Sequence, residues 1–347
     1  MEQIKALVDY SMEQAVRLLA IDSPSGYTQK AAEYVMEEYR GLGFAPAMTV
    51  KGGVLVCLNP DAPAGNGLLL EAHVDTLGGM VTGISGSGRL HLTNLGGMNP
   101  NNGEAENVRI VTRSGKIYTG TFQLKNASIH VNGSYSDTKR SYDTMEVVID
   151  EEVESRADVE KLGILPGDIV CFDPRTVVTE SGFIKSRFLD DKLSVAILLG
   201  LAKAMAAGEV RSDRQIWHHI TVFEEVGHGG SASVPDGVTE AISVDMGCVG
   251  DGLGCDERKV SICAKDSGGP YHYDITSGLI DAARRGGADF AVDVYPHYGS
   301  DVEATLRAGH DLRHGLIGPG VYASHGYERS HRKGVENTLK LLAAYLG

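Results

Sequence analysis

The spacing of apolar and polar residues predicts two helices, a hairpin and a buried strand in the first part of the chain. Residues 1–20 place apolar side chains at helical spacing among acids, and a second helix is expected to begin at Thr28. A hairpin turn is expected at residues 51–53. Residues 67–72 form an apolar run that only Glu71 interrupts, which is typical of a strand buried on both faces.

The pattern changes twice further along the chain. Between residues 78 and 185, short β-like pieces alternate with Gly, Asn, Ser and Asp turns, which predicts an inserted β-rich, barrel-like domain. After a helix at 192–207, strands and helices alternate, which predicts a mostly parallel sheet with flanking helices. We therefore expect an α/β domain formed by residues 1–77 and 186–347. The further strands are expected at 216–223, 241–244, 260–264 and 290–294, and the further helices at 274–285, 300–308 and 332–346.

Charge, cysteine content and hydropathy argue against several kinds of binding and bonding. The chain has 32 Lys and Arg against 46 Asp and Glu, a formal net charge of -14, which argues against binding to nucleic acid. Five cysteines, an odd number with no C-x-x-C spacing, indicate neither a disulfide framework nor a thiolate zinc site, so we expect a cytoplasmic protein. No basic leader and no apolar run of roughly 20 residues is present, so no membrane association is expected.

Five clusters of acids or histidines stand at the ends of apolar runs. Open α/β sheets bind ligands beyond the carboxyl ends of their strands, so these clusters are expected to meet at one edge. Carboxylates gathered around imidazoles repel one another unless a cation lies among them, and the pattern therefore predicts a metal site. The clusters are LLLEAHVD (68–75), SRFLDDK (186–192), ITVFEEVG (220–227), AISVDMG (241–247) and ASHGYERSH (323–331).

The acidic residues of these clusters have alternative interpretations. Asp190 and Asp191 precede a predicted helix, so one of them could serve only as its N-cap. A second acid pair, Glu224 and Glu225, also follows an apolar run directly, and two such pairs are hard to explain as solvated surface. Asp245 lies in an apolar strand, where an unpaired carboxylate would cost several kcal/mol. Asp245 therefore needs a partner.

The histidines carry weaker signals. His73 at a strand end would more often be a structural residue, although a neutral imidazole there can bind metal while Asp75 holds its other ring N–H. His325 and His331 compete for one ligand role. The two histidines at 218–219 lie inside a predicted strand, point to opposite faces and need no chemistry.

Motifs of other enzyme classes are absent from the sequence. The chain has no H-E-x-x-H, no G-x-S-x-G elbow, no Walker A motif and no well-placed G-x-G-x-x-G. The sequence therefore does not indicate a serine hydrolase, a P-loop nucleotide-binding protein or a nicotinamide-dependent oxidoreductase.

Taken together, these motifs resemble the M42 family of metallo-aminopeptidases. The resemblance rests on EAHVDTLGGMV, SRFLDDKLSV, FEEVGHGGSA, SVDMG, the Gly299-Ser300-Asp301 turn and the late His325, and it spans nearly the whole chain in order and spacing. It implies a zinc-exopeptidase-like α/β domain with an inserted β-barrel-like domain at 78–185. In the family this insertion joins subunits into dimers that build hollow dodecamers, which implies a homo-oligomer acting on short peptides.

The resemblance also implies a role for each candidate residue. Two divalent cations would share a water, lower its pKa and polarise the scissile carbonyl, while a general base removes the proton of the water. Imidazole and carboxylate ligands suit Zn²⁺ or Co²⁺, with Mn²⁺ as a further candidate. The implied roles are a bridging Asp190, His73 and Asp245 on one metal, Glu225 and His325 on the other, Glu224 as general base, Asp75 behind His73, and a cis peptide at Asp190–Asp191.

The end of the chain departs from the family pattern. Many relatives follow the last histidine with Ser-Pro-x-Glu, whereas this chain has His325-Gly-Tyr-Glu-Arg-Ser-His331. The variant resembles a subgroup linked to acylated dipeptide-amide osmolytes, so a metal-dependent deacylase or dipeptidase is the main alternative to an aminopeptidase. A non-catalytic assembly protein with the same fold is a second alternative. An endoglucanase is disfavoured, since glycosidases usually use two carboxylates without metal.

Overall fold

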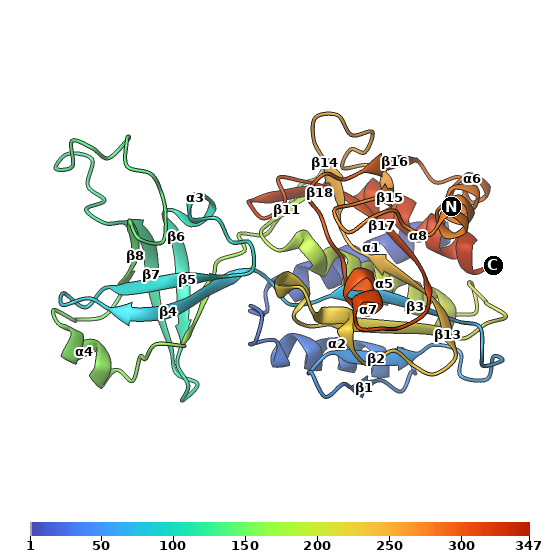
Figure 1. Ribbon diagram of the computed structural model, residues 1–347, viewed down its shortest axis with the longest axis horizontal. Helices are drawn as coiled ribbons and strands as arrows, with labels where there is room; N and C mark the ends of the chain where they lie inside the picture. Colours follow the sequence, from blue (N-terminus) through green and yellow to red (C-terminus); the bar gives the residue numbers. More distant parts are fainter. Residues whose placement is uncertain (1) are drawn as a thin grey trace. The chain divides into compact units, whose positions relative to one another are not determined.

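The computed structural model describes residues 2–347, which divide into two compact units (Figure 1). One unit runs to Asp75 and resumes from Arg175 to Gly347, and the other comprises Thr76–Pro174. The chain therefore leaves the first unit directly after the buried strand that ends in His73, and returns shortly before the Asp190–Asp191 pair.

The first unit is built on a large mixed sheet whose central strands are parallel. Its strand β3 (Gly67–His73) lies between β12 (Ile216–Thr221) and β13 (Val238–Val244), and β13 is followed by β17 (Arg313–Tyr322), with all four strands parallel. The predicted mostly parallel sheet is thereby confirmed. Shorter strands continue the sheet on both sides or pair beside β17. They are β1 (Ala47–Met48), β2 (Val54–Cys57), β18 (Glu328–His331), β11 (Phe183–Ser186), β10 (Val177–Val178), β14 (Gly247–Val249), β15 (Val260–Lys265) and β16 (Phe290–Val294).

The apolar sequence of strand β3 explains the position of His73. All seven of its residues are buried, because parallel partners cover both of its edges and helices pack on the sheet. Leu70 pairs with His218 on one side and with Ile242 on the other. The carboxyl end of β3 consequently delivers His73 next to the ends of its neighbours, where ligands of α/β sheets are expected.

Helices pack around this sheet (Figure 1). The helices α1 (Glu2–Leu19), α5 (Leu189–Ala206) and α8 (Arg332–Leu346) contact one another, and α5 and α8 contact the sheet. The others are α2 (Gln29–Gly41), α6 (Tyr273–Gly286), α7 (Asp301–Arg307) and the short η1 (Glu224–Val226) and η2 (Gly229–Ser231). Within residues 2–347, no helix combines the length and apolar character that crossing a bilayer requires.

The second unit is a closed six-stranded barrel. In barrel order its strands are β4 (Gly78–Ile84), β5 (Leu90–Leu95), β8 (Met145–Ile149), β7 (Ile117–Leu124), β6 (Glu106–Val111) and β9 (Ile169–Phe172). Alternate residues point inward, and among them Phe122 and Phe172 meet edge to face with ring centroids 5.5 Å apart. Two short helices, α3 (Pro100–Gly103) and α4 (Arg156–Lys161), complete the unit. The expected barrel-like fold is confirmed.

The second unit is shorter than the insertion expected at 78–185. Strands β10 and β11, which the sequence analysis grouped with the insertion, belong to the first unit because β11 pairs with β18. In this pairing Ser186 stands opposite Glu328. The short, turn-rich sequence of β10 and β11 resembles the barrel strands locally, and only the distant partner β18 separates them from the barrel.

The ten-residue strand β17 was missing from the predicted strands. Its sequence RHGLIGPGVY contains three glycines and a proline, which are depleted in strands. Space explains one of the glycines, because a Cβ at Gly318 would lie 1.3 Å from the carbonyl oxygen of Asp245. The glycine therefore allows β17 to approach the segment that carries a candidate ligand.

Candidate metal centre

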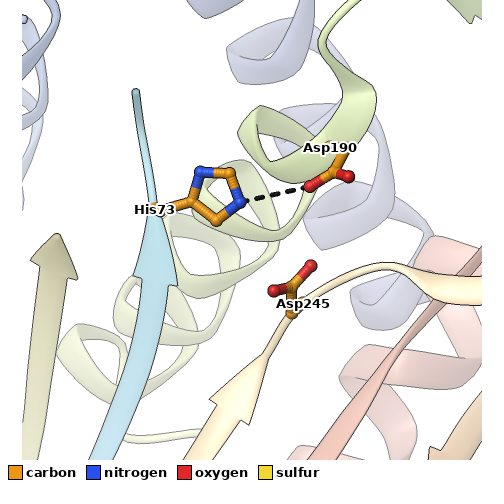
Figure 2. A group of neighbouring side chains, drawn as sticks. All are labelled: His73, Asp190 and Asp245. Atoms are coloured by element: carbon orange, nitrogen blue, oxygen red, sulfur yellow. Dashed lines mark hydrogen bonds and ion pairs between the residues drawn. The ribbon is translucent and has the colours of Figure 1, made fainter. Parts of the chain in front are cut away.

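Three buried candidate ligands converge at the carboxyl ends of the parallel strands. His73 ends β3, Asp190 lies at the start of α5, and Asp245 follows β13, and Figure 2 shows their side chains pointing toward one another. His73 Nε2 lies 3.1 Å from Asp190 Oδ1. One ligand atom of each residue lies within 4.8 Å of the others, a spacing that could hold one metal ion.

A second group of possible ligands shares Asp190 with the first. His325 Nε2 lies 3.5 Å from Asp190 Oδ2 and 3.7 Å from Glu225 Oε2, and the ligand atoms of these three residues also lie within 4.8 Å of one another. The two oxygens of Asp190 thus face different histidines, since Oδ1 faces His73. One carboxylate therefore belongs to both groups of possible ligands.

Glu224 belongs to neither group but lies beside them. Its Oε2 is 3.7 Å from His73 Nε2. Its main-chain N–H donates a hydrogen bond to Asp75 Oδ1 at 3.1 Å. Phe223, which precedes it, adopts a left-handed backbone with φ of 77°, so the chain turns sharply where β12 leads into the acid pair.

Asp75 contacts His73 mainly through its main chain. His73 Nδ1 lies 2.9 Å from the carbonyl oxygen of Asp75 and 3.5 Å from the carboxylate oxygen Oδ1. The carboxylate instead accepts hydrogen bonds from Glu224 N and, at 2.5 Å, from Ser25 Oγ. Metal binding at Nε2 would require the neutral tautomer of His73 with its proton on Nδ1, where the carbonyl oxygen of Asp75 accepts it.

Burial and repulsion between carboxylates dominate the electrostatics of the cluster. Burial opposes ionisation of Asp190, but hydrogen bonds from His325 and His73 lower its pKa. Burial, followed by repulsion from Asp190, raises the pKa of Asp245 to about 7. Burial also raises the pKa of Glu225 well above its usual value, with repulsion from Asp190 as the next cause.

One atom of the cluster tests the fit of a cation directly. Glu225 Oε1 is buried and has no hydrogen-bond partner among residues 2–347. Buried carboxylate oxygens are rarely left without a partner, and a divalent cation would supply one. Because the donors are imidazole nitrogens and carboxylate oxygens, the residues fit a divalent metal of the Zn²⁺, Co²⁺ or Mn²⁺ type.

Comparison with known proteins agrees with this geometry. The sequence profile of the M42 glutamyl aminopeptidase family matches residues 52–341. The chain belongs to this family. It is therefore a hydrolase of peptide bonds, and the metal dependence of M42 peptidases accords with the ligand groups found here.

Relatives of this M42 peptidase cover between about two thirds and nearly all of the chain. The putative aminopeptidase YhfE of Bacillus subtilis is 42% identical over 336 residues, which is 97% of both chains. The lysyl aminopeptidase of Pyrococcus furiosus is 24% identical over 243 residues, covering 69% of this chain and 66% of that protein. The TET1 peptidase of Pyrococcus horikoshii has a solved structure with a TM-score of 0.83 at 22% identity, covering 97% of this chain and 99% of the other. The last comparison shows a shared fold.

The two late histidines occupy different places. His325 joins the second ligand group, whereas His331 lies outside both. His331 Nδ1 accepts a hydrogen bond from Lys333 N at 3.0 Å and so caps α8, and its Nε2 lies 2.9 Å from the carbonyl oxygen of Ser181. His331 therefore has a structural environment.

The Asp190–Asp191 pair also separates into two positions. The peptide bond between them is cis, as the family resemblance implied. Asp190 faces the two histidines rather than capping α5, while Asp191 Oδ2 accepts a hydrogen bond from His73 N at 3.2 Å. The regular part of α5 begins after the pair, because both residues deviate from helical backbone angles.

Two further acids escaped the sequence analysis as site residues. Glu328 is 2% exposed and accepts hydrogen bonds from Asp190 N at 3.1 Å and His325 N at 3.0 Å. Asp301 accepts hydrogen bonds from Gly230 N at 2.6 Å and Thr221 Oγ1 at 2.5 Å, which links the segments before and after the Glu224–Glu225 pair. The quoted motifs contain both acids, but only three-dimensional contacts reveal what they hold.

A cavity of about 430 Å³ opens onto the ligand groups. Five of its lining residues are acids, and the only Lys or Arg among the lining residues is Arg307. The Arg307 guanidinium lies 3.3 Å from Glu303 Oε2. The lining residues are Asp190, Glu224, Glu225, Gly227, Asp245, Met246, Cys248, His297, Tyr298, Gly299, Ser300, Asp301, Ala304, Arg307, Ser324 and His325.

Proposed function

We propose that the protein is a two-metal aminopeptidase that removes N-terminal residues from short peptides. The observation that carries the proposal is the sharing of Asp190 by two ligand groups, with one carboxylate oxygen toward each histidine. In this proposal Asp190 bridges the cations, His73 and Asp245 complete one site, and Glu225 and His325 complete the other. Zn²⁺ or Co²⁺ is the favoured metal and Mn²⁺ a further candidate, since the donors are nitrogen and oxygen.

The chemistry requires an electrophile and a base at the same place. Divalent cations held by these residues would polarise a peptide carbonyl and lower the pKa of a bound water. Glu224 is the proposed general base because it lines the cavity beside the ligand groups without belonging to either. Its carboxylate removes the proton of the attacking water and later donates it to the leaving amine. Asp75 supports this role by holding the main chain of Glu224.

The proposed substrates are short because the cavity is small. A volume of about 430 Å³ accommodates a few residues of an extended peptide and excludes a folded chain. The acidic wall around the centre suits a free N-terminal ammonium group, which carries a positive charge at neutral pH. We therefore expect a preference for free over blocked N-termini.

We further propose that the chain acts as a homo-oligomer in the cytoplasm. Solved structures with the same fold include a TET1 dodecamer and a TET1 peptidase that assembles into a tetrahedron or an octahedral shell. The barrel unit, Thr76–Pro174, contributes no residue to either ligand group, so we assign it to dimerisation and assembly. The cysteines of the described chain are free, which is usual in a reducing compartment.

The test combines metal analysis with a substrate panel. Metal content is measured per subunit, and aminoacyl-anilides are compared with the corresponding N-acetylated compounds in Zn²⁺, Co²⁺ and Mn²⁺. The proposal predicts two metals per subunit and hydrolysis of the free compounds that a chelator abolishes. Preferential hydrolysis of the acetylated compounds would replace it by the deacylase alternative, and hydrolysis without any metal would overturn it.

A further inference from the structure

The side chain of Glu328 links two candidate ligands that come from different parts of the fold. Glu328 begins β18, and its carboxylate is buried at the centre. Oε2 accepts from the main-chain N–H of Asp190 at 3.1 Å, and Oε1 accepts from the main-chain N–H of His325 at 3.0 Å. One carboxylate thus spans the start of α5 and the loop between β17 and β18.

Both of the linked segments have irregular backbone. Asp190 has non-helical angles although it lies within α5, and His325 has a left-handed backbone with φ of 61°. Ala323, two residues earlier, is also left-handed with φ of 59°. Such conformations are unfavourable for residues with a side chain and persist where surrounding contacts hold them. The Glu328 carboxylate is a contact of this kind for His325.

The loop that carries His325 is fixed on its other side as well. Tyr327 Oη donates a hydrogen bond to the carbonyl oxygen of Arg175 at 2.7 Å, and the Arg175 guanidinium lies 4.6 Å from the centre of the Tyr327 ring. Gly326 N donates to the carbonyl oxygen of Ala323 at 3.0 Å, which closes the turn. In the variant sequence after His325, Gly326 therefore closes the turn, Tyr327 attaches the loop to Arg175, and Glu328 attaches it to the candidate centre.

We infer that Glu328 is a positioning residue that sets the distance between Asp190 and His325 and thereby the affinity of the second cation site. The inference rests on the proposed two-metal function. Groups that orient metal ligands through hydrogen bonds commonly change metal affinity about 10- to 100-fold when they are replaced. The first site shares Asp190, but its other two ligands, His73 and Asp245, make none of the contacts with Glu328 described above, so we expect a smaller effect there.

A purely structural role for Glu328 is the competing explanation. Glu328 also pairs with Ser186 in the sheet, so its replacement could simply loosen β18. Asp293 offers a matched control, because the residue is 7% exposed and its carboxylate accepts hydrogen bonds from Gly254 N at 2.7 Å and Cys255 N at 3.1 Å. It makes the same kind of two-amide link in the same unit but lines neither ligand group nor the cavity.

The experiment compares Glu328→Gln with Asp293→Asn in the full-length protein. Each substitution turns one accepting oxygen into an NH₂ group, which cannot accept a hydrogen bond from a main-chain N–H. Metal-free protein is titrated with Co²⁺ alone, and the visible absorption of bound Co²⁺ reports the two binding steps. Circular dichroism and thermal midpoints of the metal-free proteins measure folding separately. Glu328→Asp is a second variant that keeps the charge and shortens the side chain.

The expected result is a selective loss at one binding step. Glu328→Gln should weaken one Co²⁺ step about 10- to 100-fold and the other much less, Glu328→Asp should weaken the same step, and Asp293→Asn should leave both steps within about twofold of wild type. Unchanged Co²⁺ binding by folded Glu328→Gln and Glu328→Asp, or equal losses in Asp293→Asn, would overturn the inference. Failure of the wild-type protein to bind two Co²⁺ ions would instead refute the two-metal function itself.

Discussion

The carboxylate of Asp75 holds the main-chain N–H of Glu224 at 3.1 Å, while the carbonyl oxygen of the same aspartate lies 2.9 Å from His73 Nδ1. One residue therefore orients a candidate ligand through its main chain and the candidate base through its side chain. The relative placement of ligand and base follows from this double contact, which links the ends of β3 and β12.

Replacing the candidate base and the candidate bridging ligand should have different effects. Glu224→Gln should abolish turnover, by at least about 100-fold in kcat, while metal content per subunit stays nearly unchanged. Asp190→Asn should lose both metal and activity, because both ligand groups include it. Metal analysis and kcat on an aminoacyl-anilide check both variants. Substantial activity of Glu224→Gln with every metal tried would contradict the proposed mechanism.

Asp75→Asn should impair turnover more than metal binding. The amide can still accept one of the hydrogen bonds that the carboxylate accepts from Glu224 N and Ser25 Oγ, but not both in the same way. We expect kcat to fall about 10- to 100-fold with two metals still bound. Ser25→Ala is the matched control, since it removes only the remote hydrogen bond and should have a smaller effect. Loss of metal in Asp75→Asn would show that the carboxylate acts chiefly on His73.

The two late histidines provide a paired comparison. His325→Ala should weaken one metal site, because it removes an imidazole from the second ligand group. His331→Ala should leave metal affinity unchanged and lower the free energy of unfolding by about 1 kcal/mol through loss of the α8 cap. Metal titration and chemical denaturation of both variants measure these effects. The reverse pattern would assign the ligand role to His331.

His218 predicts a pH dependence of stability that is separate from catalysis. Burial lowers its pKa to about 3, and its Nδ1 lies 2.9 Å from Tyr39 Oη. Because the folded-state pKa is below the unfolded value of about 6.5, the neutral form stabilises the fold above pH 6.5, and this contribution is lost as the pH falls toward 3. Between pH 7 and 5, wild type should lose about 2 kcal/mol more than His218→Asn.

Denaturation curves at pH 7 and pH 5 provide the measurement for this prediction. The asparagine amide retains an acceptor for Tyr39 and has no titrating group in this range, so other acids and histidines affect both proteins alike. Equal pH dependence of wild type and variant would show that folding does not lower the pKa of His218.

The assembly proposal predicts a large particle. Static light scattering of the purified protein should give a mass many times that of one 37.0 kDa chain. Activity should fall steeply with increasing peptide length, because an enclosed assembly and a small cavity both restrict access. A monomer that removes residues from folded proteins would contradict the role given to Thr76–Pro174.

The sequence predicted those features whose signal is local. The apolar run at residues 67–72 predicted β3. The regular part of α5 begins after Asp191, as expected. Strand β17 was not predicted because its sequence contains glycines and a proline, which are depleted in strands. Gly318 is needed there for close packing, which the sequence pattern does not show. The position of β11 depends on pairing with β18, which lies far away in sequence.

The candidate centre was predicted as a set of residues but not as a geometry. Acid pairs after apolar runs and the family resemblance singled out His73, Asp190 and Asp245, which the structure brings together (Figure 2). Glu328 could not be predicted as a site residue, because an acid after a loop has no distinctive sequence pattern. Its contact with the centre consists of two hydrogen bonds from main-chain N–H groups. Contacts that involve the main chain leave little trace in the sequence.

The order of the ligands along the chain has a consequence for biosynthesis. A ribosome delivers His73 early, then the whole barrel, then Asp190, Glu225 and Asp245, and His325 almost last. Contacts between segments so distant in sequence form late in folding, because the intervening chain must first be ordered. A nascent or truncated chain that ends before β17 therefore lacks a complete centre. Under the proposed two-metal function, unfinished copies would not hydrolyse peptides.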